Sequence, residues 1–154
     1  MVVTAGKPAE LDIELVLQDG RKVNVQELWK EHGVVFFMFP KADTPGCTIQ
    51  ACGFNDAIHD IEARGFRVYG LSADTPEELQ AWKTKKTFQY EFLADPKHEL
   101  IREFGSSLDD GTRVQRSHVI VLPGGVVGEI RHEISPQESY ESALEFIKKH
   151  GTTA

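Results

Sequence analysis

The most apolar stretch of this chain, residues 34–39, contains no polar side chain and is rich in β-branched and aromatic residues. A run of this kind without alternation predicts a buried strand, and the segment 66–71 predicts a second one. Two hairpins are predicted around turn residues: strands 15–17 and 22–25 around Asp19-Gly20, and strands 117–122 and 126–131 around Pro123-Gly124-Gly125. The pattern therefore predicts a sheet with a hairpin towards each end of the chain.

Helices are predicted where apolar spacing, capping residues and chain breakers agree. A short helical segment covers 25–31 and ends near Gly33, and a longer helix begins close to Cys47 and continues to about residue 63, before Gly65. A third helix starts within 74–78 and turns Leu79 and Trp82 towards the sheet. Two more open at Asp95-Pro96, running through Ile101 and Phe104, and at Ser135-Pro136, with Tyr140, Leu144 and Ile147 on the apolar face.

This order of elements is βαβ followed by ββα, with extra elements in front and between. It predicts an α/β protein with a thioredoxin-like fold, in which helices flank a central mixed sheet and an N-terminal β-hairpin is added. No repeat, linker or low-complexity tract interrupts the 154 residues, so we expect one domain over 1–154. A fold of this class leaves the function open.

Composition excludes several classes of function. The net charge of −7 argues against nonspecific binding to nucleic acid or to anionic membranes. The nearest basic group, Lys83, Lys85 and Lys86, is interpreted as the solvated face of a helix. No apolar run approaches the roughly 18 residues that a membrane span needs. The first eight residues do not resemble a secretory signal, so we expect a cytoplasmic location, with the nucleus as the alternative.

The two cysteines of the chain are the strongest chemical signal. Two thiols are too few for a disulfide scaffold, and with scattered histidines they do not form a zinc motif, so we expect no metal. Cys47 stands where the predicted helix begins, and the positive end of a helix stabilises a thiolate over a thiol. Cys52 follows five residues later and can capture whatever Cys47 becomes. This arrangement is typical of a redox catalyst, and an inert buried Cys47 is the alternative.

The same segment carries a family resemblance. Pro40, Thr44 and Cys47 match the Pro-x-x-x-Thr-x-x-Cys signature of peroxiredoxins, and Thr-Pro-Gly-Cys-Thr with a cysteine five residues on resembles the peroxiredoxin Q (bacterioferritin comigratory protein) subfamily. The segments 69–74, 93–96 and 116–121 follow in the family's order, so the resemblance runs from about Gly6 to Lys149. The sequence departs from the family at 7–11, which lacks the usual Pro-Asp-Phe, and at His118, where the family often has Thr.

The resemblance implies a thiol peroxidase that reduces hydrogen peroxide and alkyl hydroperoxides in antioxidant defence. Cys47 would be the peroxidatic residue and Cys52 the resolving one, joined afterwards in a disulfide that thioredoxin or a glutaredoxin reduces. Thr44 would orient the peroxide, Pro40 would shape the loop and shield the thiolate, and the backbone N–H groups of Gly46 and Cys47 would stabilise the developing charge. No cofactor is implied, and we expect a monomer, with a weak dimer as the alternative.

A fixed positive charge is also implied beside the thiolate. Arg116, directly before the strand 117–122, corresponds to the family's arginine, and Arg113 is the competing residue. From the residues alone the two arginines are equal, since each could be an ordinary surface residue. A guanidinium suits the role because it stays charged and offers several hydrogen-bond donors.

Helix geometry adds a constraint on the two thiols. Five residues on one helix give about 7.5 Å of rise and about 140° of rotation, which separates the Cα atoms by roughly 8–9 Å. A disulfide requires about 4.4–6.8 Å, so the helix must unwind before Cys47 and Cys52 can join.

Two other functions stay open. One is a redox-signalling protein that docks on a partner when oxidised, and the other, disfavoured by the Cys-x-x-x-x-Cys spacing, is a disulfide oxidoreductase.

Overall fold

The computed structural model, which describes residues 2–151, is built around strand β3 (Gly33–Met38). β3 pairs in parallel with β4 (Phe66–Ser72) and antiparallel with β8 (Ser117–Val121). The complete seven-stranded sheet has the order β2-β1-β5-β4-β3-β8-β9. Its remaining strands are β1 (Glu14–Leu17), β2 (Lys22–Asn24), β5 (Glu91–Ala94) and β9 (Val127–His132). The expected thioredoxin-like α/β fold with a mixed sheet and an N-terminal hairpin is confirmed.

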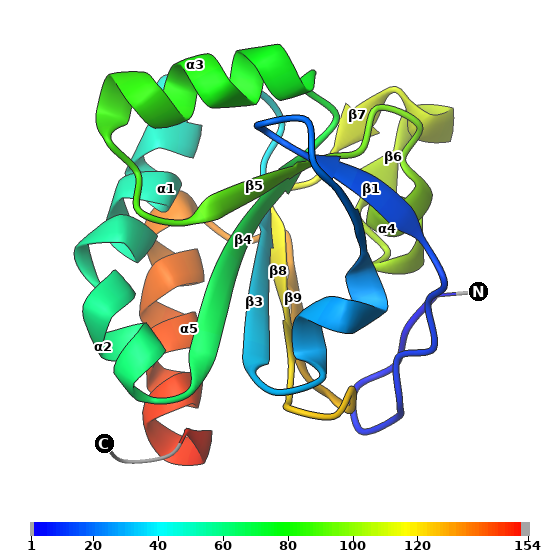
Figure 1. Ribbon diagram of the computed structural model, residues 1–154, viewed down its shortest axis with the longest axis vertical. Coiled ribbons are helices and arrows are strands. Elements are labelled where there is room, and N and C mark those ends of the chain that lie inside the picture. The colour runs from blue at the N-terminus through cyan, green and yellow to red at the C-terminus, as the bar shows by residue number, and fades with distance from the viewer. Residues whose placement is uncertain (1, 152–154) are drawn as a thin grey trace.

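Side chains of β3 alternate between two hydrophobic cores, one on each face of the sheet. Val35 and Phe37 face a core shared with the helices α1, α2, α3 and α5. Val34 and Phe36 face a second core, shared with the short helices η1 and α4. Figure 1 shows α1, α2 and α5 grouped along one side of the sheet. The helices are η1 (Val25–Trp29), α1 (Pro45–Asp56), α2 (Ile58–Ala63), α3 (Pro76–Lys86), α4 (Glu99–Glu103) and α5 (Pro136–His150).

The helix predicted from Cys47 to about residue 63 is wrong as a single element, because the structure divides it at Ala57. The Ala57 N–H donates a hydrogen bond to the carbonyl of Phe54, three residues earlier, at 3.2 Å. This bond interrupts the i to i−4 hydrogen-bond pattern of α1. α2 then begins at Ile58, so that Phe54, Ile58 and Ile61 still share the buried face. The division leaves Cys47 and Cys52 together on α1.

Several short elements were not predicted from the sequence. β5 is one of them, and its strand conformation depends on pairing with β4 and β1. A separate hairpin of β6 (Ser107–Leu108) and β7 (Arg113–Val114) encloses the turn η2 (Asp109–Gly111). At the start of α3 the cap is Thr75, which forms a capping box with Glu78. Within residues 2–151 no helix is long and apolar enough to cross a membrane.

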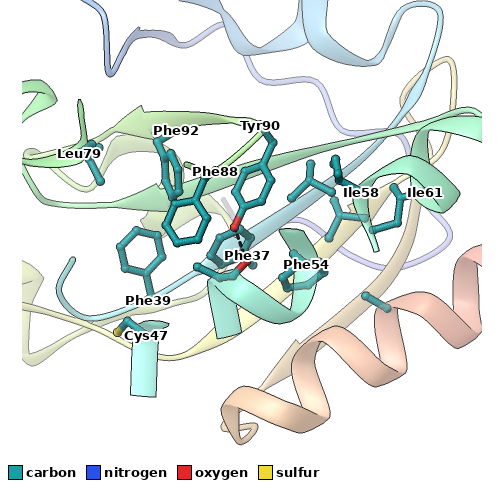
Figure 2. Packing of buried hydrophobic residues seen from close by; sticks show 14 of the residues in the cluster. Phe37, Phe39, Cys47, Phe54, Ile58, Ile61, Leu79, Phe88, Tyr90 and Phe92 are labelled. Atoms are coloured by element: carbon teal, nitrogen blue, oxygen red, sulfur yellow. Dashed lines mark hydrogen bonds between the residues drawn. The ribbon is translucent and has the colours of Figure 1, made fainter. Parts of the chain in front are cut away.

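α1 is fixed on the sheet by an aromatic cluster and by polar ties. The Tyr90 hydroxyl donates to the carbonyl of Ala51 at 2.6 Å, the bond drawn in Figure 2 beneath the stacked rings of the cluster. The Asn55 side chain accepts from the backbone N–H of Gln89 at 2.8 Å. On the other side of the helix, the ring of Tyr140 on α5 packs directly over Gly53. α1 is therefore enclosed between α5 and the segment just before β5.

The contact at Gly53 predicts that Gly53→Ala destabilises the protein, whereas the same change in most helices is stabilising. A Cβ at this position would lie 2.1 Å from the Tyr140 ring, so Gly53→Ala must displace α5 or the ring. At an open helical site the same change would stabilise by about 1 kcal/mol. Here we expect a loss of about 1–3 kcal/mol in the free energy of unfolding, measured by urea denaturation. In a Tyr140→Ala background the ring is absent, and Gly53→Ala should become neutral or stabilising; an equal loss in both backgrounds would contradict this account.

Candidate active site

Cys47 is the third residue of α1, and its thiol is almost completely buried, with 1% of the residue exposed. Thr44 is the N-cap in an extended conformation, and Pro45 occupies the first helical position. The Thr44 side chain makes no capping hydrogen bond. The N–H groups of Gly46 and Cys47 therefore lie in the first turn, at the positive end of the helix, without that side chain as acceptor. Figure 2 places Cys47 at the margin of the aromatic cluster, beside Phe39.

A guanidinium lies against the sulfur of Cys47. Arg116 Nη2 is 3.5 Å from Cys47 Sγ, and the side chain reaches there from the residue just before β8. Gly46 leaves room for this approach, because a Cβ there would lie 3.0 Å from the same nitrogen, which is a tight contact. Arg113 is exposed instead and pairs with Asp109 at 3.2 Å. Of the two arginines considered from the sequence, only Arg116 is brought to Cys47.

Gln50 is a site residue that the sequence analysis missed. Its amide oxygen accepts from Arg116 Nη1 at 2.8 Å, and its amide nitrogen donates to Ser139 Oγ on α5 at 3.0 Å. Gln50 and Ser139 are both fully buried. The available signal was a polar residue one helical turn after Cys47 and hence on the same face of the helix. Arg116 is therefore oriented by two contacts, one to the sulfur and one to Gln50.

The loop before α1 supplies the remaining residues predicted for the site. Thr44 Oγ1 donates its hydrogen to the carbonyl of Lys41 at 2.8 Å, so towards a bound molecule the hydroxyl has acceptor lone pairs only. The role expected for Thr44, orienting the peroxide, is thereby limited to accepting a hydrogen bond. Pro40 follows β3 in the same loop and is itself exposed.

A buried carboxylate anchors this loop. Asp74 accepts from the N–H of Ala42 at 2.9 Å and from Ser72 Oγ at 2.7 Å, and it pairs with Lys41 at 2.7 Å. Lys41 also pairs with Glu78 on α3. The hydrogen bond from Lys41, with those from Thr75, lowers the pKa of Glu78 to about 2. The segment that carries Thr44 is thus attached to β4 and α3 independently of α1.

Cys52 lies on α1 with Cys47, as expected, and both thiols are free. Cys52 is partly buried against the aromatic core. Burial raises the pKa of its thiol; nearby Lys86 opposes this effect and Asp56 adds to it. Because α1 is unbroken between the two residues, their Cα atoms are separated by roughly 8–9 Å, beyond the reach of a disulfide. In this conformation Cys47 has a guanidinium neighbour, whereas Cys52 is held as a thiol.

Comparison with known proteins gives a consistent result. The AhpC/TSA family matches residues 5–130. Peroxiredoxin bcp1 of Schizosaccharomyces pombe is 41% identical over 139 residues, which cover 88% of this chain and 70% of that protein. Peroxiredoxin Bcp of Escherichia coli is 29% identical over 141 residues, covering 86% and 88%. A mutant PrxQ from Xylella fastidiosa has the same fold, with a TM-score of 0.90 at 19% identity and coverage of 97% and 98%.

The family match covers α1, the residues around Cys47 and the sheet as far as residue 130 in β9. The resemblance drawn from the Pro40–Cys47 signature is thereby confirmed, and the chain belongs to the AhpC/TSA family, as a peroxiredoxin.

Proposed function

We propose that this protein is a thiol peroxidase that reduces hydrogen peroxide and alkyl hydroperoxides, with Cys47 as the peroxidatic residue. The observation that carries the proposal is the contact between Arg116 Nη2 and Cys47 Sγ at the N-terminus of α1. A thiolate at this position has a fixed cation and two helix N–H groups beside it, which favour the ionised sulfur and a polar transition state.

In the first step the Cys47 thiolate attacks one oxygen of the peroxide. A sulfur–oxygen bond forms and the oxygen–oxygen bond breaks, so that Cys–S⁻, ROOH and one proton from solvent give Cys–SOH and ROH. The N–H groups of Gly46 and Cys47, with Arg116, stabilise the charge that develops on the peroxide oxygens. Thr44 accepts the hydrogen of the peroxide OH group, because its own hydrogen is already donated to Lys41.

In the second step Cys52 resolves the sulfenic acid. Its thiol attacks the oxidised sulfur, giving the Cys47–Cys52 disulfide and one water molecule. The length of the intact helix prevents this step, so the first turns of α1 must unwind. An external dithiol then reduces the disulfide and becomes a disulfide itself. Thioredoxin is the expected reductant and a glutaredoxin the alternative, while a monomeric state and a cytoplasmic location stay predictions from the sequence.

The roles of the two cysteines can be separated by substitution. Cys47→Ser should abolish peroxide consumption, because a serine hydroxyl is not ionised near neutral pH. Cys52→Ser should react once, accumulate the sulfenic acid and lose turnover with thioredoxin. Turnover is measured as peroxide consumption with a thioredoxin system. The sulfenic acid is trapped and measured by mass spectrometry. Multiple turnovers by the Cys47 variant would overturn its assignment, and a wild-type protein that stalls after one oxidation would favour the redox-signalling function instead.

The two arginines form a matched pair of variants. Arg116→Ala removes the cation at the sulfur, and we expect the second-order rate of reaction with peroxide to fall by about a hundredfold, as for the loss of one transition-state donor. Arg113→Ala removes only an exposed ion pair and should change the rate by less than about twofold. Stopped-flow measurement of thiol oxidation gives both rates. The reverse ranking would contradict the assignment of Arg116.

Unwinding of α1 predicts a redox-dependent exchange pattern. Formation of the disulfide should break the bonds from Gln50 to Ser139, from Tyr90 to Ala51 and from Gln89 to Asn55. Backbone amides of residues 46–55 should then exchange with solvent faster in the oxidised protein, while β3 and β8 stay protected. Hydrogen exchange followed by mass spectrometry measures this, with peroxide-treated Cys52→Ser as the control that cannot form the disulfide. Equal protection of 46–55 in both redox states would exclude the unwinding step.

A further inference from the structure

A chain of hydrogen bonds continues from Gln50 through the interior of the protein to the far edge of the sheet. Beyond Gln50, Ser139 Oγ lies 3.2 Å from His118 Nδ1, and His118 Nε2 lies 2.8 Å from a carboxylate oxygen of Glu129. Gln50, Ser139 and His118 have no exposed surface. The members come from four elements, α1, α5, β8 and β9. These hydrogen bonds therefore connect α1, which carries Cys47, to α5 and to the two strands β8 and β9.

One direction of donors and acceptors satisfies every member of this chain of hydrogen bonds. The guanidinium of Arg116 has donors but no acceptor, so the oxygen of the Gln50 amide faces it and the nitrogen faces Ser139. Ser139 Oγ accepts from that nitrogen and has its own hydrogen left for His118 Nδ1. His118 therefore accepts at Nδ1, carries its proton at Nε2 and donates it to Glu129.

Glu129 is suited to the end of this chain because it stays ionised. Burial acts to raise the pKa of its carboxyl group, but the hydrogen bonds from His118 and Arg131 and the positive charge of Arg131 outweigh this, and the pKa is lowered. Arg131 lies on β9 with Glu129, and its Nε is 3.5 Å from the second carboxylate oxygen of Glu129. An ionised acceptor at Nε2 fixes the imidazole tautomer that Ser139 requires.

We propose that His118 is a positioning residue, which acts through Ser139 and Gln50 to hold the guanidinium of Arg116 on Cys47. This chain of hydrogen bonds orients the Arg116 guanidinium and does not transfer protons, because neither an amide nor a guanidinium passes a proton near neutral pH. The proposal deepens the peroxidase function proposed above and rests on it. It also assigns a role to a histidine at a strand position where the family often has Thr.

Ser139 is the link to remove first, because Ser139→Ala is small and suits a helix. Without its oxygen, the Gln50 nitrogen loses its acceptor and the amide is free to turn away from Arg116. In a Cys52→Ser background only Cys47 titrates as a thiol, so the ultraviolet absorbance of the thiolate against pH reports it directly. We expect roughly threefold to tenfold less thiolate at a pH below the midpoint, the effect of about one hydrogen bond. The rate of the single oxidation by peroxide should fall in parallel.

Ser142→Ala is the matched control on the same helix. Its hydroxyl donates to the carbonyl of Glu138 at 2.6 Å and takes no part in the chain, so its thiolate titration should equal that of the parent protein. His118→Leu should shift the titration as Ser139→Ala does. His118→Asn, which keeps an acceptor near the Nδ1 position, should restore part of the shift. If His118→Leu does not fold, Ser139→Ala and Ser142→Ala still give the answer.

A double substitution tests whether the chain acts through Arg116. In Arg116→Ala the guanidinium is gone, so adding Ser139→Ala should produce no further change in the thiolate titration. An undiminished additional shift, or a folded Ser139→Ala protein that titrates like Ser142→Ala, would overturn the proposal. Because the titration needs no peroxide, it is independent of turnover. A protein with the expected titration but no peroxide consumption would contradict the peroxidase function and leave the positioning role intact.

Discussion

The contact between Arg116 and Cys47 is the interaction on which the rest of this structure depends. A thiolate that is almost fully buried is costly unless a positive group or several hydrogen-bond donors accompany it. The fold meets this requirement from two separate directions: α1 brings its positive end to the sulfur, and the residue before β8 brings the guanidinium. Gly46 leaves the space for their meeting. Any change in how α1 lies against β8 and α5 therefore alters the contact between the Cys47 sulfur and Arg116.

α1 has to satisfy two opposing demands in the proposed cycle, since it must be docked for the first step and unwound for the second. Its buried face explains how both are met. Only Phe54 among its buried residues is a large apolar side chain, and the others are Cys47, Gln50 and Ala51. Apart from the packing of Phe54 and Gly53, the helix is held by hydrogen bonds to its neighbours, each of which is worth about 0.5–1.5 kcal/mol. A helix attached in this manner can leave the sheet by withdrawing one large ring, that of Phe54, from the aromatic core beneath it.

Apart from what the family resemblance supplied, the sequence predicted features that a local pattern marks. It missed those that depend on distant residues or carry no local marker. The apolar run of β3 and the helix start at Cys47 are local patterns, and both were correct within a few residues. Gln50 was missed because its partners, Arg116 and Ser139, are 66 and 89 residues away along the chain. β5 was missed because four residues become a strand only by pairing on both sides. The break at Ala57 is a single altered hydrogen bond with no marker such as Pro or Gly.

The anchoring of the loop before α1 sets the time scale on which the site can be restored. Asp74 holds Ala42 and Lys41 to β4, and at the other end α2 stays packed through Ile58 and Ile61. The unwound segment is thus anchored at both of its ends. Its refolding into α1 requires the closure of a small loop followed by growth of the helix. Such events take on the order of a microsecond or less in peptides. A peroxidase built this way would be limited in its rate of recovery by encounters with its reductant and not by its own refolding.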